Sequence, residues 1–352
     1  MSCHITVAIP TYNGAQRVPQ VLERLLAQQH LENIKWEVLV IDNNSTDNTP
    51  QIVHDFQEHW RKKHGNSKVP LRYLKEMKQG AAHARQKAVE MAQGQWIAFL
   101  DDDNIPAANW IFAVHQFTEF RSQSSKKIGA FGGKIRGVFP EGNQVELIRY
   151  VRPFLAVVER GDRPFQYELK YKVLPPSAGL VVRREAWLRA VPKTLILGGR
   201  TADSMLTSED LETLVHLQRK GWEVWYNPAM EIDHLIPQWR LERQYLIPFL
   251  RGVGLTRYVI RMLRLPFWKR PLWTALYALN DFRKLTDHVL KFRSRLGQDL
   301  VADCKFTLLY SNLVSPLFMG YQRLKKIQFR LGRKSVKHKS AISSPVMESN
   351  PK

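Results

Sequence analysis

The sequence predicts an α/β fold: a mixed, mostly parallel sheet flanked by helices, with a basic helical extension at its C-terminal end. Three observations lead to this prediction. Apolar strand-like runs alternate with helical patterns over residues 5–100, the order becomes mixed after residue 128, and helical periodicity dominates from residue 245 onward. A β-α-β-α order is typical of a parallel sheet with helices on both faces.

The individual elements are predicted from the period of their apolar residues and from the turn residues between them. Strands are expected at residues 5–9, 36–41, 71–74, 96–100, 128–133, 177–187 and 222–228. Helices are expected at residues 18–26, 80–92 and 208–221, and Ser45 or Thr46 is expected to cap a further helix.

Length and composition set the domain organisation. The 352 residues are 44% hydrophobic, which is enough for a sizeable core, and the two cysteines exclude a disulfide scaffold or a four-cysteine zinc site. We predict an α/β domain over residues 1–240, a basic, aromatic-rich helical extension over residues 241–335, and a disordered tail over residues 336–352.

The positive charge is concentrated in the predicted extension. The chain carries a net charge of +21, and residues 240–339 hold 22 Lys and Arg against 5 Asp and Glu, a net charge of +17. A basic segment with interleaved aromatics favours nucleic acid or an anionic lipid surface, and a solvated helical surface is the alternative. No signal peptide is predicted, because the first ten residues have no basic start or long apolar stretch and are typical of a β-strand. No membrane-spanning segment is predicted either, because the best candidate, residues 306–322, is short and interrupted by polar residues.

Polar side chains follow three of the predicted strands at the point where each strand ends. Thr11 and Asn13 follow the first strand, Asp42 follows the second, and Asp101–Asp103 follow "WIAFL". Ligands of parallel α/β sheets bind at the carboxyl ends of the strands. The sequence therefore predicts a binding site where these side chains converge.

The three consecutive aspartates allow two interpretations. Asp101 and Asp103 suit a divalent cation that carries a diphosphate, because Mg²⁺ and Mn²⁺ prefer hard oxygen ligands. The alternative is that the carboxylates cap the helix that begins near Ala107.

Further groups with chemical potential lie at the starts of helices and at a strand end. "TSEDLE" opens the helix at residues 208–221, where a carboxylate is either a helix cap or a general base for a substrate hydroxyl. His234 ends a predicted strand with Arg240 nearby, and a lone histidine there is either structural or part of the same cleft. Gly80 allows close backbone approach to a ligand, and Arg85 can pair with phosphate.

Five motifs, in this order and at these intervals, resemble the family 2 inverting glycosyltransferases of the GT-A fold. They are "VAIPTYNG", "EVLVIDNNSTDNT", "GAAHAR", "FLDDDN" and "SEDLE", and the resemblance covers residues 4–240. The whole chain, including "LPPSAGLVVR", "GWEVWYNP" and "HLIPQWRL", is also similar to the hormogonium polysaccharide biosynthesis glycosyltransferases of cyanobacteria. The resemblance implies a Rossmann-like catalytic domain over residues 1–240 that uses nucleotide-diphospho-sugars, and a role in exopolysaccharide or other surface polysaccharide biosynthesis.

The resemblance also implies roles for individual residues. Asp210 matches the catalytic base, with Glu209 as its neighbour. Asp103 matches the metal position of the DxD element, and Asp101 and His234 are the further expected metal ligands. The donor nucleotide is expected to contact Pro10, Thr11, Asn13, Asp42, Asn44, Gly80, Arg85, Asp101 and Asp102.

The acceptor is expected beside Ser177, Ala178 and Gly179, although an ordinary strand glycine is the alternative for the last of these. The implied cofactor is Mg²⁺ or Mn²⁺, the donor is a UDP- or GDP-sugar, and the acceptor is a saccharide or a lipid-linked saccharide. We expect a location in the cytoplasm or at the cytoplasmic face of an anionic membrane, with no nucleic acid as partner.

Three other functions have to be distinguished. A polyprenyl-phosphate sugar synthase differs in transferring the sugar to a lipid phosphate. A sugar nucleotidyltransferase is expected to carry a "GxGTR"-like segment, which "PTYNGAQR" lacks. Nucleic-acid binding would use the basic extension, which contains no recognisable RRM or zinc finger. The absence of a QxxRW element and of multiple membrane spans argues against a processive synthase.

Overall fold

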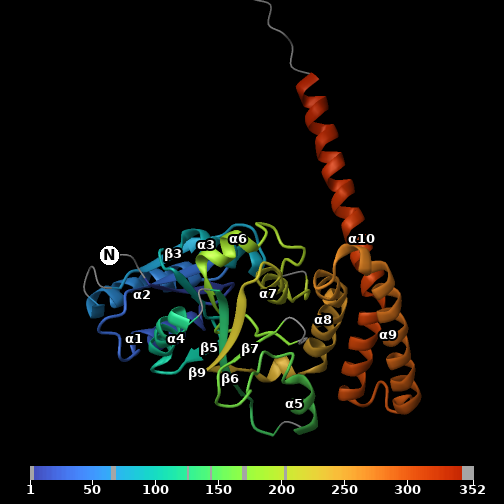
Figure 1. The fold of residues 1–352 in the computed structure, drawn as a ribbon, viewed down its shortest axis with the longest axis horizontal. Coiled ribbons are helices and arrows are strands. Elements are labelled where there is room, and N and C mark those ends of the chain that lie inside the picture. The colour runs from blue at the N-terminus through green and yellow to red at the C-terminus, as the bar shows by residue number, and fades with distance from the viewer. Residues whose placement is uncertain are drawn as a thin grey trace, which may run out of the picture.

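The computed structural model describes residues 4–64, 69–124, 127–142, 145–168, 173–201 and 204–342. Figure 1 shows an α/β region that contains the N-terminus and, beside it, a group of long C-terminal helices. Cys3 and residues 343–352 of the predicted tail lie outside the described ranges.

The centre of the α/β region is a mixed sheet with the strand order β3-β2-β1-β4-β8-β6-β9-β5. Its strands are β1 (Ile5–Thr11), β2 (Trp36–Asp42), β3 (Leu71–Lys75), β4 (Trp96–Phe99), β5 (Asn104–Pro106), β6 (Ile128–Val138), β7 (Phe165–Gln166), β8 (Val181–Arg183) and β9 (Glu223–Leu235). β1 to β4 are parallel to their neighbours among these four, and β6 is parallel to β9. β8 is antiparallel to β4 and β6, and β5 and β7 are antiparallel to β9. The predicted mixed sheet is therefore confirmed.

Helices cover the sheet and explain why its central strands lack alternating polarity. Every residue of β2 and β4 is buried, as is usual for strands that are covered on both faces. The helices of the α/β region are α1 (Val18–Leu26), α2 (Thr49–His64), α3 (Ala81–Met91), α4 (Trp110–Ser124), α5 (Val145–Val151), α6 (Arg184–Ala190) and α7 (Glu209–Arg219).

Helix α1 shows how the core positions a functional side chain. Val21, Leu22 and Leu25 are fully buried, and burial of such side chains stabilises the helix by about 1.5–3 kcal/mol each. Arg17 occupies the N-cap position without capping the helix through its side chain, so its guanidinium is available for contacts with other elements. The apolar face of α1 thus fixes the start of the helix against the sheet.

The predicted strand at residues 177–187 is wrong over most of its length. Only Val181–Arg183 form a strand, and α6 begins at Arg184. Gly179 has a φ angle of +66°, a conformation that glycine adopts without steric cost. The segment before β8 is therefore a turn.

The C-terminal region consists of η1 (Gln238–Leu241), α8 (Arg243–Leu263), η2 (Phe267–Lys269), α9 (Arg270–Phe292) and α10 (Leu300–Ile342). α8 contacts α7 on one side and α10 on the other, and α10 also packs against α9 (Figure 1). Gly252 allows this close packing, because a Cβ atom there would lie 2.0 Å from the carbonyl oxygen of Met205. α8 therefore belongs to the helical extension and also lies against the loop that precedes α7.

The predicted domain boundaries fall inside elements of this region. The boundary at residue 240 lies within η1, and α10 continues to Ile342, past the predicted boundary at residue 335. Residues 336–342 of the predicted disordered tail are thus described as helix. Among the residues that the structure describes, no helix is long and apolar enough to cross a membrane.

Candidate functional site

A cavity of about 810 Å³ lies where β1 and β4 end and reaches α8 on its other side. It is lined from the sheet side by Pro10, Thr11, Asp101, Asp102, Asp103 and His234, from the helix starts by Ala81, Ala84, Arg85, Ser208, Glu209 and Asp210, and from α8 by Tyr245, Phe249, Val253 and Arg257. The carboxyl ends of parallel strands are the usual ligand site of such sheets. Of the polar side chains predicted to converge, Thr11 and Asp101–Asp103 therefore meet at a cavity, whereas Asn13 and Asp42 do not line it.

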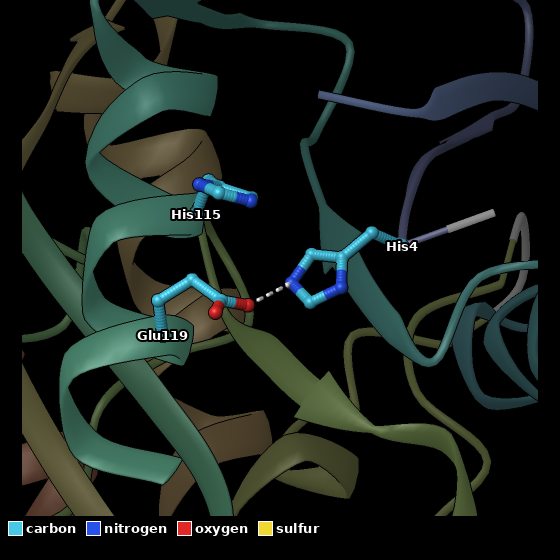
Figure 2. A group of neighbouring side chains, drawn as sticks. All are labelled: His4, His115 and Glu119. Carbon is cyan, nitrogen blue, oxygen red and sulfur yellow. Dashed lines mark ion pairs between the residues drawn. The ribbon is translucent and has the colours of Figure 1, made fainter. Parts of the chain in front are cut away.

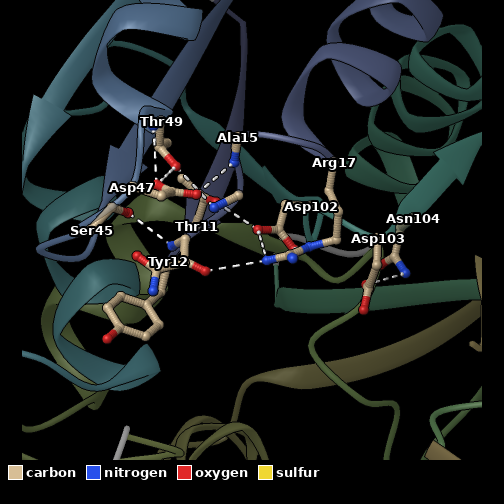
Figure 3. A network of polar contacts seen from close by, with 12 residues as sticks. Thr11, Tyr12, Ala15, Arg17, Ser45, Asp47, Thr49, Asp102, Asp103 and Asn104 are labelled. Atoms are coloured by element: carbon tan, nitrogen blue, oxygen red, sulfur yellow. Dashed lines mark hydrogen bonds and ion pairs between the residues drawn. The ribbon is translucent and has the colours of Figure 1, made fainter. Parts of the chain in front are cut away.

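Asp102 is tied to β1 and to the start of α1 (Figure 3). The Thr11 hydroxyl donates a 2.6 Å hydrogen bond to Asp102 Oδ2, and Arg17 contacts both carboxylate oxygens, at 3.1 Å through Nε and 3.0 Å through Nη2. Burial raises the pKa of Asp102, and the charge of Asp103 adds to this, while Arg17 and Thr11 offset only part of the effect. No sequence motif singles out Arg17, because its partner lies 85 residues away.

Asp103 is held by three side chains. Arg240 Nη2 lies 2.8 Å from Oδ2, His234 Nε2 lies 3.5 Å from the same oxygen, and Asn104 donates a 3.1 Å hydrogen bond to Oδ1. His234 Nδ1 lies 2.9 Å from the Leu155 carbonyl oxygen, so Nδ1 carries the proton and Nε2 accepts a 3.1 Å hydrogen bond from Arg240. Burial alone would raise the pKa of Asp103, but the adjacent Arg240 guanidinium opposes this and holds it well below its usual range.

Asp103 and His234 fit a divalent cation. Their ligand atoms are 3.5 Å apart, a separation that suits two ligands at about 2.1 Å from one ion. The hydrogen bond from Nδ1 of His234 to a carbonyl is the arrangement that metal-ligating histidines usually have. In this structure the Arg240 guanidinium donates hydrogen bonds to the same two atoms, so a cation bound there would take the place of these two hydrogen bonds. Asp101, the third expected ligand, is paired with Arg85 instead.

Arg85 connects the starts of two helices to the end of β4. Its Nη1 lies 2.7 Å from Glu209 Oε1, and its Nη2 lies 3.2 Å from Asp101 Oδ1. Burial lowers the pKa of Arg85, but Asp101 and Glu209 outweigh this and raise it overall. The side chain is therefore a permanent buried cation in the cavity wall, and its Nε has no hydrogen-bond partner among the described residues.

Asp210 lies in the first turn of α7 and points to the cavity. Its oxygens accept hydrogen bonds from the backbone N–H groups of Ser177 at 3.1 Å and Leu211 at 2.8 Å. Burial and the adjacent charge of Glu209 raise the pKa of Asp210 to about 6, although Arg85 opposes the shift. A carboxylate with this pKa is ionised at neutral pH and is a more effective proton acceptor than an ordinary aspartate.

Asp42 lies behind the cavity wall and does not line it. The residue is fully buried, and its carboxylate accepts hydrogen bonds from the Ser45 backbone N–H at 2.8 Å and the Tyr73 hydroxyl at 2.5 Å. Burial and Asp42 together raise the pKa of Tyr73, so the tyrosine stays a donor. Asp42 therefore supports the strand-end loop in this structure.

Three other predicted donor-binding residues belong to the same supporting loops. Asn13 and Asn44 have φ angles of 49° and 65°, and the Asn13 side chain accepts a 2.9 Å hydrogen bond from the Thr46 backbone N–H. Gly80 donates its backbone N–H to Asn43 Oδ1 at 2.7 Å. Figure 3 shows Ser45, which accepts a 2.9 Å hydrogen bond from the backbone N–H of Asn13, near the Thr11–Asp102 contact. These residues shape the loops at the strand ends.

The expected acceptor segment is divided by the turn before β8. Ser177 and Ala178 line the cavity, whereas Gly179 does not. A Cβ atom on Gly179 would lie 3.1 Å from Ile232, and its positive φ angle accounts for glycine at this position. The turn thus explains Gly179 without a ligand.

The side of the cavity formed by α8 carries residues that no motif indicates. Tyr245, Phe249, Val253 and Arg257 follow one another at four-residue spacing and therefore share one face of α8. Arg200 lies over the Phe249 ring, 5.1 Å from its centroid, and donates a 3.0 Å hydrogen bond to the Tyr245 hydroxyl. We call these five residues the α8 wall. Their spacing predicts a shared face but not what that face contacts.

A separate group of metal-binding side-chain types lies where β1 begins (Figure 2). His4, His115 and Glu119 offer ligand atoms that lie within 4.8 Å of one another. His4 Nε2 is 3.7 Å from Glu119 Oε1 and 2.8 Å from the Thr118 hydroxyl. None of the three lines the cavity described above.

Residues 6–120 match the family model of glycosyl transferase family 2. Among curated relatives, the Escherichia coli UDP-Glc:alpha-D-GlcNAc-diphosphoundecaprenol beta-1,3-glucosyltransferase WfgD is 34% identical over 105 residues, which are 30% of this chain and 37% of WfgD. Glycosyltransferase AglE of Haloferax volcanii is 28% identical over 138 residues, which are 39% of this chain and 41% of AglE. The chain thus matches less than half the length of these two relatives.

The fold agrees with that of a solved glycosyltransferase. The mannosyltransferase PcManGT from Pyrobaculum calidifontis, in complex with GDP-Man and Mn²⁺, aligns with a TM-score of 0.55 over 92% of this chain and 88% of its own, at 18% sequence identity. The likeness concerns the fold, and the chain has the GT-A fold with a helical C-terminal region.

Proposed function

We propose that this chain is an inverting glycosyltransferase that moves a sugar from a nucleotide-diphosphate sugar to an acceptor hydroxyl, in the biosynthesis of an exopolysaccharide or another surface polysaccharide. The observation that carries the proposal is the buried Asp210 carboxylate, with its pKa of about 6, in the same cavity as Asp103 and His234. The family 2 match over residues 6–120 supports the class of reaction, and WfgD supports the polysaccharide pathway. The finer similarity to the cyanobacterial hormogonium subgroup stays a prediction.

Asp210 is the proposed general base. The backbone N–H groups of Ser177 and Leu211 orient its carboxylate. Glu209 is not proposed as the base, because its carboxylate is held in an ion pair with Arg85. Asp210 takes the proton of the acceptor hydroxyl while the hydroxyl oxygen forms a bond to the anomeric carbon. The bond from that carbon to the diphosphate breaks on the opposite face, so the configuration at the anomeric carbon inverts.

Asp103 and His234 would hold Mg²⁺ or Mn²⁺. The bound cation supplies stabilisation of the negative charge that develops on the leaving diphosphate. Arg85 and Arg240 add fixed positive charge from the cavity wall. Pro10 and Thr11 line the adjoining part of the cavity, which we assign to the nucleotide of a UDP- or GDP-sugar.

The C-terminal helices are proposed to bind the surface of an anionic membrane. Four leucines of α9 fall on one helical face and are exposed to 64%, 45%, 67% and 69%: Leu272, Leu276, Leu279 and Leu290. The net charge of +17 over residues 240–339 attracts anionic lipid, and exposed apolar side chains favour the interface. This location suits a lipid-linked saccharide as acceptor, the kind of acceptor that is part of WfgD's name.

The proposal is tested with a panel of UDP- and GDP-sugars. We expect at least one of them to raise the melting temperature of the protein in the presence of Mn²⁺ and to release its nucleoside diphosphate when an acceptor is added. Product analysis by NMR is expected to show inverted configuration at the anomeric carbon. Transfer to a lipid phosphate would identify a polyprenyl-phosphate sugar synthase, and DNA binding without any nucleotide effect would contradict the glycosyltransferase proposal.

A further inference from the structure

Five of the six arginines that line the cavity fall into two groups, and the sixth, Arg160, lies over the Tyr167 ring, 5.8 Å from its centroid. Those on the sheet side are neutralised by carboxylates: Arg17 by Asp102, Arg85 by Asp101 and Glu209, and Arg240 by Asp103. Arg200 and Arg257 of the α8 wall form no ion pair with a carboxylate in the described part of the chain. Among the described residues, the cavity therefore has one side where the arginines are ion-paired and one side where two exposed arginines have no carboxylate partner.

Arg257 forms no ion pair with Asp281, because another arginine already binds that carboxylate. The carboxylate of Asp281 acts on Arg257 through its charge, but both of its oxygens are bound by Arg261, which contacts Oδ1 at 2.9 Å and also contacts Oδ2. Although the Arg257 side chain is partly exposed to solvent, burial of its remaining part lowers its pKa, and the charge of Arg261 lowers it further. An anion that enters this side of the cavity would relieve the repulsion between the two arginines.

Arg200 is oriented by aromatic rings. Its guanidinium lies over Phe249 and is hydrogen-bonded to the Tyr245 hydroxyl, and these two rings are stacked with centroids 5.5 Å apart and an angle of 20° between their planes. Tyr245 in turn packs edge-on against Trp239. The side chain is therefore held in place before any ligand binds, although none of the described carboxylates forms an ion pair with it.

We infer that Arg200 and Arg257 form a subsite for a phosphate group of the acceptor. The inference rests on the proposed glycosyl transfer and names the class of acceptor: a saccharide attached to a phosphate or a diphosphate. A planar guanidinium binds phosphate oxygens through two parallel hydrogen bonds, and two such groups from different elements fix a phosphate in orientation. A neutral saccharide offers hydroxyl acceptors but no opposite charge, so its hydrogen bonds to the two guanidinium groups would be weaker than those of a phosphate.

The position of the subsite agrees with this role. Arg257 lies on α8, whose other side packs against α10, so the subsite adjoins the helices that we propose to contact a membrane. Asp210 and Ser177 line the same cavity, and the hydroxyl of Ser208, two residues before Asp210, lies 3.2 Å from that of Thr256, the neighbour of Arg257. An acceptor phosphate at the α8 wall would thus place the attached sugar between the membrane-facing helices and the proposed base.

The test is a titration of the full, tag-free chain in saturating UDP, GDP and Mn²⁺, so that the donor site is occupied. The probes are farnesyl diphosphate, ribitol 5-phosphate and glucuronic acid, and binding is measured by calorimetry. We expect at least one phosphate probe to bind the wild type and to bind about tenfold more weakly to Arg200→Gln and to Arg257→Gln, because each substitution removes a charge-assisted hydrogen bond. Arg257→Lys is expected to restore part of the affinity.

Arg251→Gln is the matched control. Arg251 is exposed on the same helix but does not line the cavity, so its substitution is expected to leave the affinity for the probes unchanged. Binding of farnesyl diphosphate would indicate a lipid-linked acceptor, and binding of ribitol 5-phosphate would indicate a polyol phosphate.

The outcomes separate this inference from the proposed function. The inference is wrong if the wild type binds neither phosphate probe, if glucuronic acid binds more tightly than both, or if the Arg200 and Arg257 variants bind like the wild type. Weaker nucleotide binding in the same variants would assign the arginines to the donor and also overturn it. A wild type that binds neither UDP nor GDP would instead refute the glycosyltransferase proposal, whatever the phosphate titration gives.

Discussion

The two sides of the cavity differ in how their charges are satisfied. On the sheet side, Asp102 and Asp103 are already paired with arginines, so that part of the site is rigid before a ligand arrives. On the α8 wall, Arg200 and Arg257 carry charge with no carboxylate partner in the part of the chain that the structure describes. Groups that act on developing charge work best when they are fixed in advance, whereas a binding subsite gains affinity when the ligand supplies the missing charge. The difference predicts loss of chemistry from changes on the sheet side and loss of acceptor affinity from changes on the α8 wall.

The largest effect is expected for Asp210→Asn. An amide cannot accept the proton of the acceptor hydroxyl, so turnover should fall by about 10³-fold, within the usual range for a general base. Turnover with a saturating nucleotide-sugar measures the effect, and nucleotide affinity is the control because it should survive. The melting temperature at pH 8 should not fall by more than a few degrees, since the substitution removes a buried charge. Near wild-type turnover would mean that another group is the base.

A smaller effect is expected for Asp103→Ala. The substitution removes an oxygen ligand beside His234 and leaves Arg240 without its carboxylate partner. The Mn²⁺-dependent part of nucleotide affinity should fall by about 10- to 100-fold. Nucleotide titrations with and without Mn²⁺, together with Mn²⁺ binding followed by EPR, measure the change. Unchanged affinity in Mn²⁺ would exclude Asp103 as a metal ligand.

The pH dependence tests the raised pKa of Asp210. Because the protonated carboxyl cannot act as a base, the rate should rise about tenfold per unit as pH approaches about 6 from below and then level off. Glu209→Gln removes a negative neighbour, so the midpoint should move to lower pH. Profiles of kcat against pH for both proteins check this, and a midpoint that stays fixed in Glu209→Gln would argue against coupling between the two carboxyls.

The smallest effect is expected on the exposed face of α9. Replacing Leu272 and Leu276 by serine removes apolar side chains that are proposed to enter the lipid interface, so binding to anionic vesicles should weaken several-fold. Vesicle sedimentation at low and high salt measures this binding. Leu188→Ser is the control, because Leu188 is also an exposed leucine but lies on α6. Vesicle binding that is absent, or insensitive to salt, would contradict the membrane proposal.

Local patterns were sufficient for much of the fold and for part of the site. The apolar runs that became β1, β2 and β4, and the polar residues that follow them, are close in sequence, and the parallel topology brings their ends together. Asp101–Asp103 and Asp210 could be singled out because each directly adjoins an element that its own sequence defines. The segment at residues 177–187 was predicted wrongly, because its apolar content did not reveal the turn at Gly179 or the start of α6.

The sequence by itself therefore established an α/β sheet with carboxylates at its strand ends and a basic C-terminal region, since these depend on period, turns and composition. Only the tertiary structure decided which charges are paired. Arg240 donates a hydrogen bond to Asp103, which is 137 positions away in the sequence, and Tyr73 donates one to Asp42, which is 31 positions away. The α8 wall faces the cavity only because Gly252 lets α8 pack closely against the loop before α7. Such contacts depend on the packing of distant elements, which no local pattern encodes.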